Sequence, residues 1–558
     1  MAQFVISTSS ADPVRPYLEG VAKSLVDRLY GENGPAWGTK LSVIEETIGA
    51  IRLVLSEKML DEALQRQADA ADERPAEFQC CPKCGKEVQK DPDKDDKRIL
   101  PTTVGEAEWT EPGTYCRKCR RAFYPQSKSL GIDRTGLSPT LQAKVVRAGT
   151  KNSSFAQGSE DLLDYLQLEV DPKQVERVTE RIGAERCDQR DAEVERYMSL
   201  PLVERKDKPK GVVAPALAVV SVDGGRLQIR GEPKVSATGE KEASAADDAH
   251  KGKHWREDKI GLLMTMKSEE QPSDPCPEVP SGFVDPTRIA KLARELKTKK
   301  SASVETTTTE VAGESDAPEK AEEILREQGQ AAEWEPPEVM SKHLTATRRP
   351  WASLGPMVAT KAWELGFYQA PRQAFVGDGG ENVWTVWRNH FSSFTPILDI
   401  IHAISYLFAG AMAGRPFTEG WVCYERWMTW VWKGEVEKVI AEMAARQAEL
   451  GAVQEGDGDT HPRVIVGTAL RYMQNNKDKM RYAEYRRRGM PITSSYVESA
   501  VKQFNQRVKG TEKFWTEEGA EALLQLRADY LGPTIVLDEF WKDRQNKTTG
   551  QNSYTQAV

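Results

Sequence analysis

Residues 214–231 read APALAVVSVDGGRLQIRG, and this stretch sets the fold class of the second half of the chain. Two runs rich in apolar and β-branched residues flank Gly224-Gly225, a pattern that predicts two strands joined by a tight turn. A third strand is predicted over Ile260 to Lys267. Asp223 ends the first run, so its carboxylate is expected at the rim of a sheet.

Two further acidic residues occupy comparable positions. Asp378 ends a second apolar run, AFVGDGG, and Glu498 lies in the first turns of a helix expected to begin near Thr493 or Ser494. Strand-end aspartates and a helix that crosses the rim can place their carboxylates together. Such a cluster suits Mg²⁺ or Mn²⁺. Two ions about 3.5 to 4 Å apart would serve an in-line phosphodiester displacement.

Each of these signals also has a purely structural explanation. Asp-Gly-Gly is an ordinary turn sequence. Ser495-x-x-Glu498 matches a capping box, and Glu498 with Lys502 forms an i, i+4 pair. The order strand Asp, strand Asp, helix Glu is what favours the functional interpretation.

Cysteine spacing indicates a metal site. Two Cys-x2-Cys hooks, Cys81 with Cys84 and Cys116 with Cys119, are separated by 31 residues. Four thiolates on two such turns can surround one structural Zn²⁺ at about 2.3 Å, and a closed shell of this kind leaves no position for catalysis. Cys80 is an alternative to Cys81, and chance or redox hooks are the alternative to zinc.

Net charge permits a DNA partner without requiring one. The chain carries −8 overall, but residues 301–340 hold eleven acidic and two basic residues, so the remainder sums to +1. Basic residues gather near the predicted catalytic helix, where we expect phosphate contacts. They are Arg486, Arg487, Arg488, Lys502, Arg507 and Lys509.

His402 and Arg226 each have both a functional and a structural interpretation. Asp399 and His402 form Asp-x-x-His on an apolar helix expected from Pro396 to Met412. His402 contacts the metal site or DNA in one interpretation and is a satisfied core residue in the other, which is slightly favoured. Arg226 either touches phosphate or is a strand-edge charge.

Helical segments surround these features. An amphipathic helix is predicted over Leu41 to Ala68, and short helices over 138–148, 153–166 and 172–182 form either a helix-turn-helix or a connector. A tryptophan-rich helix is expected over Trp421 to Leu450, with the tryptophans in packing roles. No apolar stretch suits a membrane span, and the N-terminus has neither a basic n-region nor an apolar h-region, so we expect a cytoplasmic protein, nucleoid-associated if it is bacterial.

Several stretches resemble DDE-type insertion-sequence transposases, most closely the ISKra group. They are SVDGGRLQIR, FVGDGGENVW with ILDIIHAISYL, and SSYVESAVKQFNQRVKGTEKFW with GAEALLQLRA, preceded by the CPKCG and CRKC hooks. The resemblance spans residues 40–535 in outline. It implies an α/β, ribonuclease-H-like catalytic domain in which Asp223, Asp378 and Glu498 bind metal. The long acidic insertion and the Gly380-Glu381-Asn382 turn depart from the family pattern.

This resemblance implies a DNA transposase that binds element ends and target DNA as a homo-oligomer. The alternatives are a ribonuclease-H-like nuclease, a domesticated DNA-binding protein and a zinc-stabilised scaffold. The expected segments are a helical region (1–75), a zinc ribbon (76–128), a helical, helix-turn-helix or connector region (129–210), two catalytic parts (211–270 and 342–415) around an acidic insertion (271–341), a helical insertion (416–480), and a catalytic helix with tail (481–558).

Overall fold

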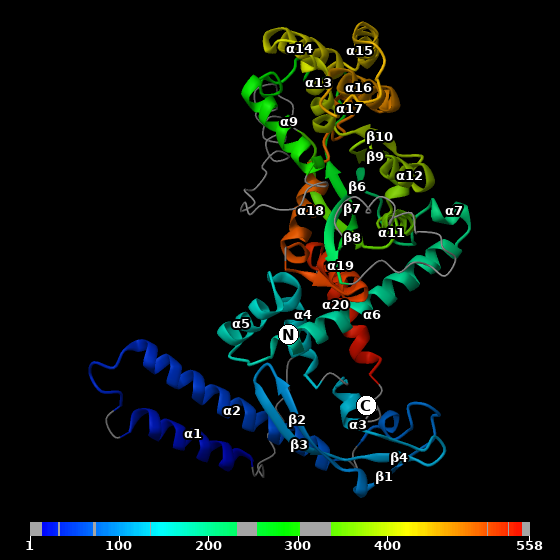
Figure 1. Ribbon diagram of the computed structural model, residues 1–558. Helices are drawn as coiled ribbons and strands as arrows, with labels where there is room; N and C mark the ends of the chain where they lie inside the picture. Colours follow the sequence, from blue (N-terminus) through cyan, green and yellow to red (C-terminus); the bar gives the residue numbers. More distant parts are fainter. Residues whose placement is uncertain are drawn as a thin grey trace. The chain divides into compact units, whose positions relative to one another are not determined.

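The protein is a mixed α/β structure of two units, seen here in a computed structural model (Figure 1). One unit comprises Met1–Thr179 with Ile535–Val558, and the other Glu180–Thr534. The structure describes residues 14–31, 34–70, 74–133, 136–230, 254–301, 336–510, 512–533 and 535–548. Residues 302–335 of the acidic insertion lie outside these ranges. Among the described helices, none combines the length and hydropathy needed to cross a bilayer.

The second unit is built on a mixed sheet flanked by helices (Figure 1). Its strand order is β10-β9-β6-β7-β8, with β11 added beside the end of β6. β6 is antiparallel to β7 and β7 to β8, whereas β6, β9 and β10 are parallel. The strands are β6 (Leu217–Ile229), β7 (Trp255–Lys267), β8 (Glu338–Thr347), β9 (Arg372–Gly377), β10 (Thr395–Leu398) and β11 (Phe514–Trp515).

β6 runs through Gly224-Gly225 without turning, so the prediction of two strands joined by a turn is wrong. Both glycines keep the antiparallel register with β7, and neither has the positive φ that a tight hairpin turn requires. They instead make room for the neighbouring strand. A Cβ on either one would lie 2.8 Å from a carboxylate oxygen, of Glu257 for Gly224 and of Asp258 for Gly225.

Asp258 is a buried acid of β7, opposite Gly225 in the sheet. Its side chain is 0% exposed, and among the described residues neither carboxylate oxygen has a hydrogen-bond partner outside its own residue. Burial raises the pKa of Asp258 from 3.8 to about 7. The carboxyl is therefore protonated over much of the acidic range, because ionisation without a partner is costly.

Asp258→Asn is expected to change the pH dependence of stability. The unfolded chain ionises this group near pH 3.8 and the folded chain near 7, so the wild-type free energy of unfolding falls as pH rises between these values. The Asp258→Asn side chain cannot ionise, so the variant does not undergo this decrease in the free energy of unfolding. Urea unfolding across this window should show the variant gaining stability relative to wild type as pH rises. Glu257→Gln, a half-exposed neighbour, is the control, and a pH-independent difference would contradict the assignment.

Helices cover the sheet and form a cap on one of its ends (Figure 1). Two predicted helices are shorter than expected. The Pro396–Met412 segment is divided into β10 and α13, and the 421–450 segment is divided at Gly434, whose φ of 80° ends a helix. The helices are α7 (Leu202–Arg205), α9 (Pro286–Ser301), α11 (Trp351–Glu364), α12 (Glu381–His390), α13 (Ile400–Met412), α14 (Phe417–Trp432), α15 (Val436–Leu450), α16 (Pro462–Asn476), α17 (Tyr482–Arg487), α18 (Ser495–Val508) and α19 (Glu517–Leu531).

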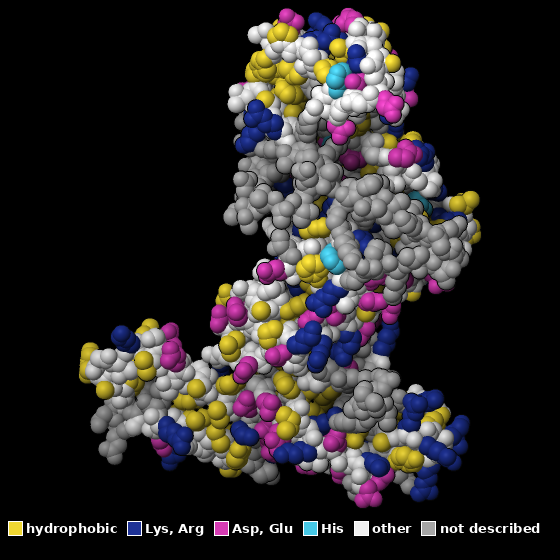
Figure 2. All heavy atoms as spheres, in the orientation of Figure 1, with side chains coloured by type: hydrophobic (Ala, Val, Ile, Leu, Met, Phe, Trp, Pro, Cys, Tyr) yellow, Lys and Arg dark blue, Asp and Glu magenta, His cyan; other side chains and the backbone are white. Residues whose placement is uncertain are grey.

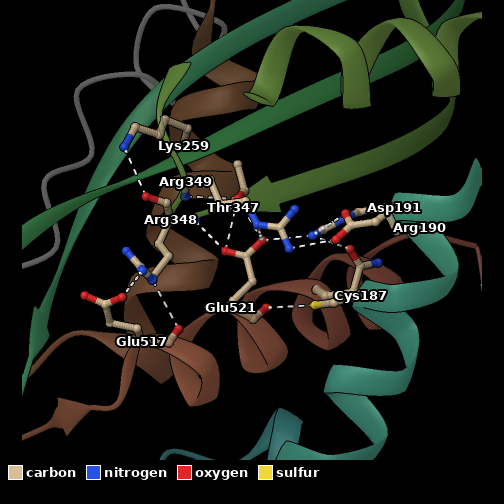
Figure 3. A network of polar contacts seen from close by, with 10 residues as sticks. Cys187, Arg190, Asp191, Lys259, Thr347, Arg348, Arg349, Glu517 and Glu521 are labelled. Carbon is tan, nitrogen blue, oxygen red and sulfur yellow. Dashed lines mark hydrogen bonds and ion pairs between the residues drawn. The ribbon is translucent and has the colours of Figure 1, made fainter. Parts of the chain in front are cut away.

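A buried ionic network ties α19 to the end of β8 and to α6 (Pro172–Ser199) (Figure 3). Glu521 of α19 accepts hydrogen bonds from Thr347 Oγ1 at 2.8 Å and from the Arg348 backbone N–H at 2.9 Å. It also pairs with Arg190 at 3.0 Å, and both side chains are over nine-tenths buried. The network fixes one edge of the sheet against two helices.

The first unit contains helices and two small antiparallel sheets. The predicted 41–68 helix is α2, and Ser138 caps α4 as expected, since its side chain accepts a hydrogen bond from the Leu141 N–H. The third short helix is longer than predicted, because α6 continues to Ser199. The elements are α1 (Val14–Tyr30), α2 (Leu41–Asp69), β1 (Gln89–Lys90), β2 (Asp96–Thr102), β3 (Gly105–Glu111), β4 (Thr114–Cys116), β5 (Arg121–Phe123), α3 (Pro125–Ser129), α4 (Pro139–Lys151), α5 (Phe155–Leu166) and α20 (Ile535–Asn546).

Candidate active site and cysteine cluster

The register of the parallel strands aligns the two predicted aspartates. Ser221 of β6 lies beside Val376 of β9. Two residues further along each strand, Asp223 and Asp378 therefore reach equivalent positions on neighbouring strands, where side chains project to the same face. β9 ends at Gly377, so Asp378 follows a strand end as predicted. Asp223 does not end its strand, because β6 continues to Ile229 and Asp223 pairs with Ile260 of β7; that prediction is wrong.

A third aspartate continues this row. Leu398, the last residue of β10, pairs with Gly377 of β9, so Asp399 follows in line with Asp378. Asp399 was not among the predicted metal ligands. Its signal in the sequence is the end of the apolar run TPIL immediately before Asp-x-x-His, which marks a strand end and a helix start together.

Asp399 holds the starts of two helices. Its Oδ2 accepts from the His402 backbone N–H at 3.0 Å and bonds the His402 ring Nδ1 at 2.6 Å. Its Oδ1 accepts from the Ser494 N–H at 2.9 Å, at the start of α18. The side chain is fully buried. Burial alone would raise the pKa of Asp399, but these hydrogen bonds and the charge of His402 lower it below its ordinary value.

Glu498 reaches the same place from α18. The ligand atoms of Asp399, His402 and Glu498 all lie within 4.8 Å of one another. Glu498 is 8% exposed, and Asp399 is fully buried. His402 thus lies beside an acid cluster, whereas the slightly favoured expectation was an ordinary core histidine.

The charges of the predicted triad act on one another. Burial raises the pKa of Asp223 to about 8, with further contributions from the charges of Asp378 and Glu498. Burial would lower the pKa of His402, but the hydrogen bond to Asp399 and the charges of Asp399, Glu498 and Asp378 raise it to about 9. Negative charge is therefore concentrated here, and the His402 imidazolium lies beside it.

Local contacts fix the backbone at Asp378. Its Oδ1 accepts from the Gly380 N–H at 2.8 Å, and its carbonyl accepts from the Tyr472 hydroxyl of α16 at 2.7 Å. Gly379 has a φ of 97°, and a Cβ there would lie 2.7 Å from the Tyr472 ring. Glycine is required at this turn for both reasons.

Two of the predicted phosphate-binding arginines are buried, so that prediction is wrong for them. Arg486 is 0% exposed, and its Nε donates to Asp274 at 2.9 Å while its guanidinium lies 3.9 Å from the Trp432 ring centroid. Arg507 is 2% exposed and lies 5.1 Å from the Trp515 ring centroid. These arginine side chains contribute to packing, a role that a run of basic residues in the sequence does not reveal.

The other basic residues remain at the surface to different degrees. Arg487 and Lys509 are exposed, and Lys502 and Arg488 are half-buried. Arg226 is also half-buried. It is an odd number of residues from Asp223 in an unbroken strand, and therefore projects from the opposite face of β6.

The cysteine cluster assembles in the first unit as predicted. The sulfur atoms of Cys81, Cys84, Cys116 and Cys119 lie within 4.8 Å of one another, with 3.7 Å between those of Cys84 and Cys116. Cys80 is not in this group. Its backbone forms an isolated antiparallel β-bridge with Glu87, across the first hook.

Backbone conformation shapes the first hook, Cys81 with Cys84. Gly85 adopts a φ of 68°, and its N–H donates to the Cys81 carbonyl at 2.9 Å. A backbone hydrogen bond at Lys86 lowers the pKa of the Cys84 thiol to about 7, whereas the hydrogen bond with Cys84 raises the pKa of Cys119 to about 12. Phe123 packs beneath two of the sulfurs in a small core.

No protein-family model matches this sequence, and no curated protein matches it. Function is therefore inferred from the residues and their geometry.

Proposed function

We propose that this chain is a DDE-type DNA transposase that cleaves the ends of an insertion sequence and joins them to target DNA. The observation that carries the proposal is the parallel register that brings Asp223 and Asp378 to equivalent positions on neighbouring strands. Glu498 belongs to the acidic group with Asp399 and His402, and its charge, like that of Asp378, adds to the effect of burial in raising the pKa of Asp223. Neighbouring carboxylates repel one another, and a divalent cation held between them would offset that repulsion.

The sheet is compatible with the ribonuclease-H-like catalytic domain that the family resemblance implies, which is a mixed sheet with flanking helices. The order β8-β7-β6-β9-β10 contains both antiparallel and parallel pairs. The first strand then carries Asp223 and the fourth precedes Asp378, as the family resemblance implies.

The donor set fits Mg²⁺ or Mn²⁺, which prefer carboxylate oxygens. Asp223, Asp378 and Glu498 would hold the ions, which when bound would activate a water or 3′-hydroxyl and neutralise charge on the scissile phosphate. Asp399 acts as a positioning residue, since it fixes both His402 and the start of α18. With its Nδ1 on Asp399, His402 can offer Nε2–H to a phosphate oxygen.

The cysteine cluster fits a structural Zn²⁺. Zn–S bonds of about 2.3 Å place sulfurs at the corners of a tetrahedron about 3.8 Å apart, close to the 3.7 Å between Cys84 and Cys116. The proposed role is to hold the small sheet of β1, β4 and β5 together. DNA contacts are proposed for Arg487, Arg488, Lys502 and Lys509.

The products formed on DNA test this function. Full-length protein, Mg²⁺ and a duplex carrying the ends that flank the gene should give nicked ends and then ends joined to a second DNA. Cleavage without joining would show a hydrolytic nuclease. Binding without cleavage would show a DNA-binding protein, and neither binding nor cleavage at low salt would overturn the proposal.

A further inference from the structure

The hairpin of α1 and α2 leaves several of its large apolar side chains exposed to solvent. The two helices lie side by side in the first unit (Figure 1). Among their residues with described side chains, only Ala68 is buried. A two-helix hairpin cannot enclose a core by itself, because each helix needs partners on both sides of its apolar stripe.

The apolar residues of α2 follow a helix-packing pattern. Ile44, Ile51 and Leu55 are half-buried and repeat at spacings of seven and four, as in a coiled-coil seam. Beside them Leu41, Ile48 and Met59 are 68%, 46% and 51% exposed. Residues seven or eleven positions apart on an α-helix project in directions that differ by only about 20°. Leu41, Ile48 and Met59 therefore lie along one stripe of α2, here named the apolar line.

Another face of α2 is already committed to β3. Carboxylate or amide oxygens from three successive turns accept the N–H groups along this strand edge, and they therefore fix the orientation of the helix. The pairs are Glu57 with Glu106 at 2.9 Å, Asp61 with Glu108 at 2.7 Å, and Gln65 with Thr110 at 2.9 Å. The apolar line is thus presented on a helix held in place within its unit.

Charge indicates which partner suits this surface. α1 carries three basic and two acidic residues, whereas α2 carries three basic and six acidic ones. The excess of acid on α2 disfavours DNA phosphates and anionic lipid as occupants. A second hairpin of the same sequence would instead set the basic α1 against the acidic α2 and supply the matching helical spacing. Hydrophobic side chains are visible over α1 and α2 in Figure 2.

We propose that the apolar line of α2 docks onto the same hairpin of a second copy of this chain. The two hairpins form a four-helix arrangement related by twofold symmetry, in which each apolar line is covered by the partner. The pairing does not require DNA, and it goes beyond the proposed reaction without depending on it.

The mass of the full-length chain in solution tests this proposal. Without DNA, wild type should sediment as a dimer, and Ile48→Glu with Met59→Glu should halve the mass, because two buried charges would face each other. Ala50→Glu, on the other side of the same helix, should leave the dimer intact. Unchanged circular dichroism would show that each variant folds.

Three results would overturn the proposal. These are a monomeric wild type, a double variant that remains dimeric, and wild type that dissociates on binding vesicles of neutral and anionic phospholipid. The last would assign the apolar line to a membrane surface.

Discussion

Asp378→Asn is expected to lose DNA cleavage by at least about 10³-fold, since metal at the scissile phosphate supplies several kcal/mol of transition-state stabilisation and about 1.4 kcal/mol is tenfold in rate. An amide keeps the shape of Asp378 and its acceptor for Gly380, but it removes one negative charge from the cluster. DNA binding should change little, because phosphate contacts come from other residues. Initial rates of nicking with Mg²⁺ measure the effect.

Glu381→Gln provides a matched control for this variant. Glu381 lies three residues away, and its side chain is 78% exposed and paired with Arg388. Its replacement should leave the cleavage rate within a few-fold of wild type. Equal rates for Asp378→Asn and wild type, at saturating DNA and Mg²⁺, would contradict the assignment of Asp378 to the metal site.

Cys81→Ser is expected to abolish zinc binding and to unfold the small sheet that the cluster holds together. Structural zinc sites have apparent binding free energies of about 10 to 16 kcal/mol in peptides, and Cys81 is buried against Phe123. Zinc content by mass spectrometry should fall to zero. Hydrogen exchange over β1, β4 and β5 should become fast, as it should in wild type after chelation.

Cys80→Ser is the control, because Cys80 neighbours Cys81 in sequence but lies outside the cluster. It should keep the zinc content and the exchange protection of wild type. If Cys80→Ser lost zinc while Cys81→Ser retained it, Cys80 and not Cys81 would be the ligand. A wild-type protein without zinc would contradict the structural role of the metal.

The sequence predicted the end of β9 and the cysteine hooks because these are local signals. The apolar run that stops at Asp378 marks a strand end, and two Cys-x2-Cys hooks confine their sulfurs to two turns. The same signal is misleading at Asp223, because β6 continues past it to Ile229 in register with β7. The cluster formed by the four cysteines is confirmed. The parallel register that aligns the aspartates comes from pairing between distant segments, which no local pattern specifies.

The errors have the same physical origin. Gly224-Gly225 was interpreted as a turn, yet β7 offers the side chains of Glu257 and Asp258 where glycine leaves space. Arg486 was assigned to DNA, but Asp274, 212 residues away, binds it in the core. The role of Asp399 is not predicted, because it arises from His402 and Ser494, which are brought together at its two carboxylate oxygens only in the fold.

Mn²⁺ binding tests the central claim most directly. Electron paramagnetic resonance can count free Mn²⁺ against zinc-loaded protein, so the cysteine cluster does not compete. Wild type should bind Mn²⁺, and Asp223→Asn, Asp378→Asn and Glu498→Gln should each weaken that binding at least tenfold, whereas Glu257→Gln should not. Wild-type affinity in all three variants would show that these carboxylates do not share a metal site.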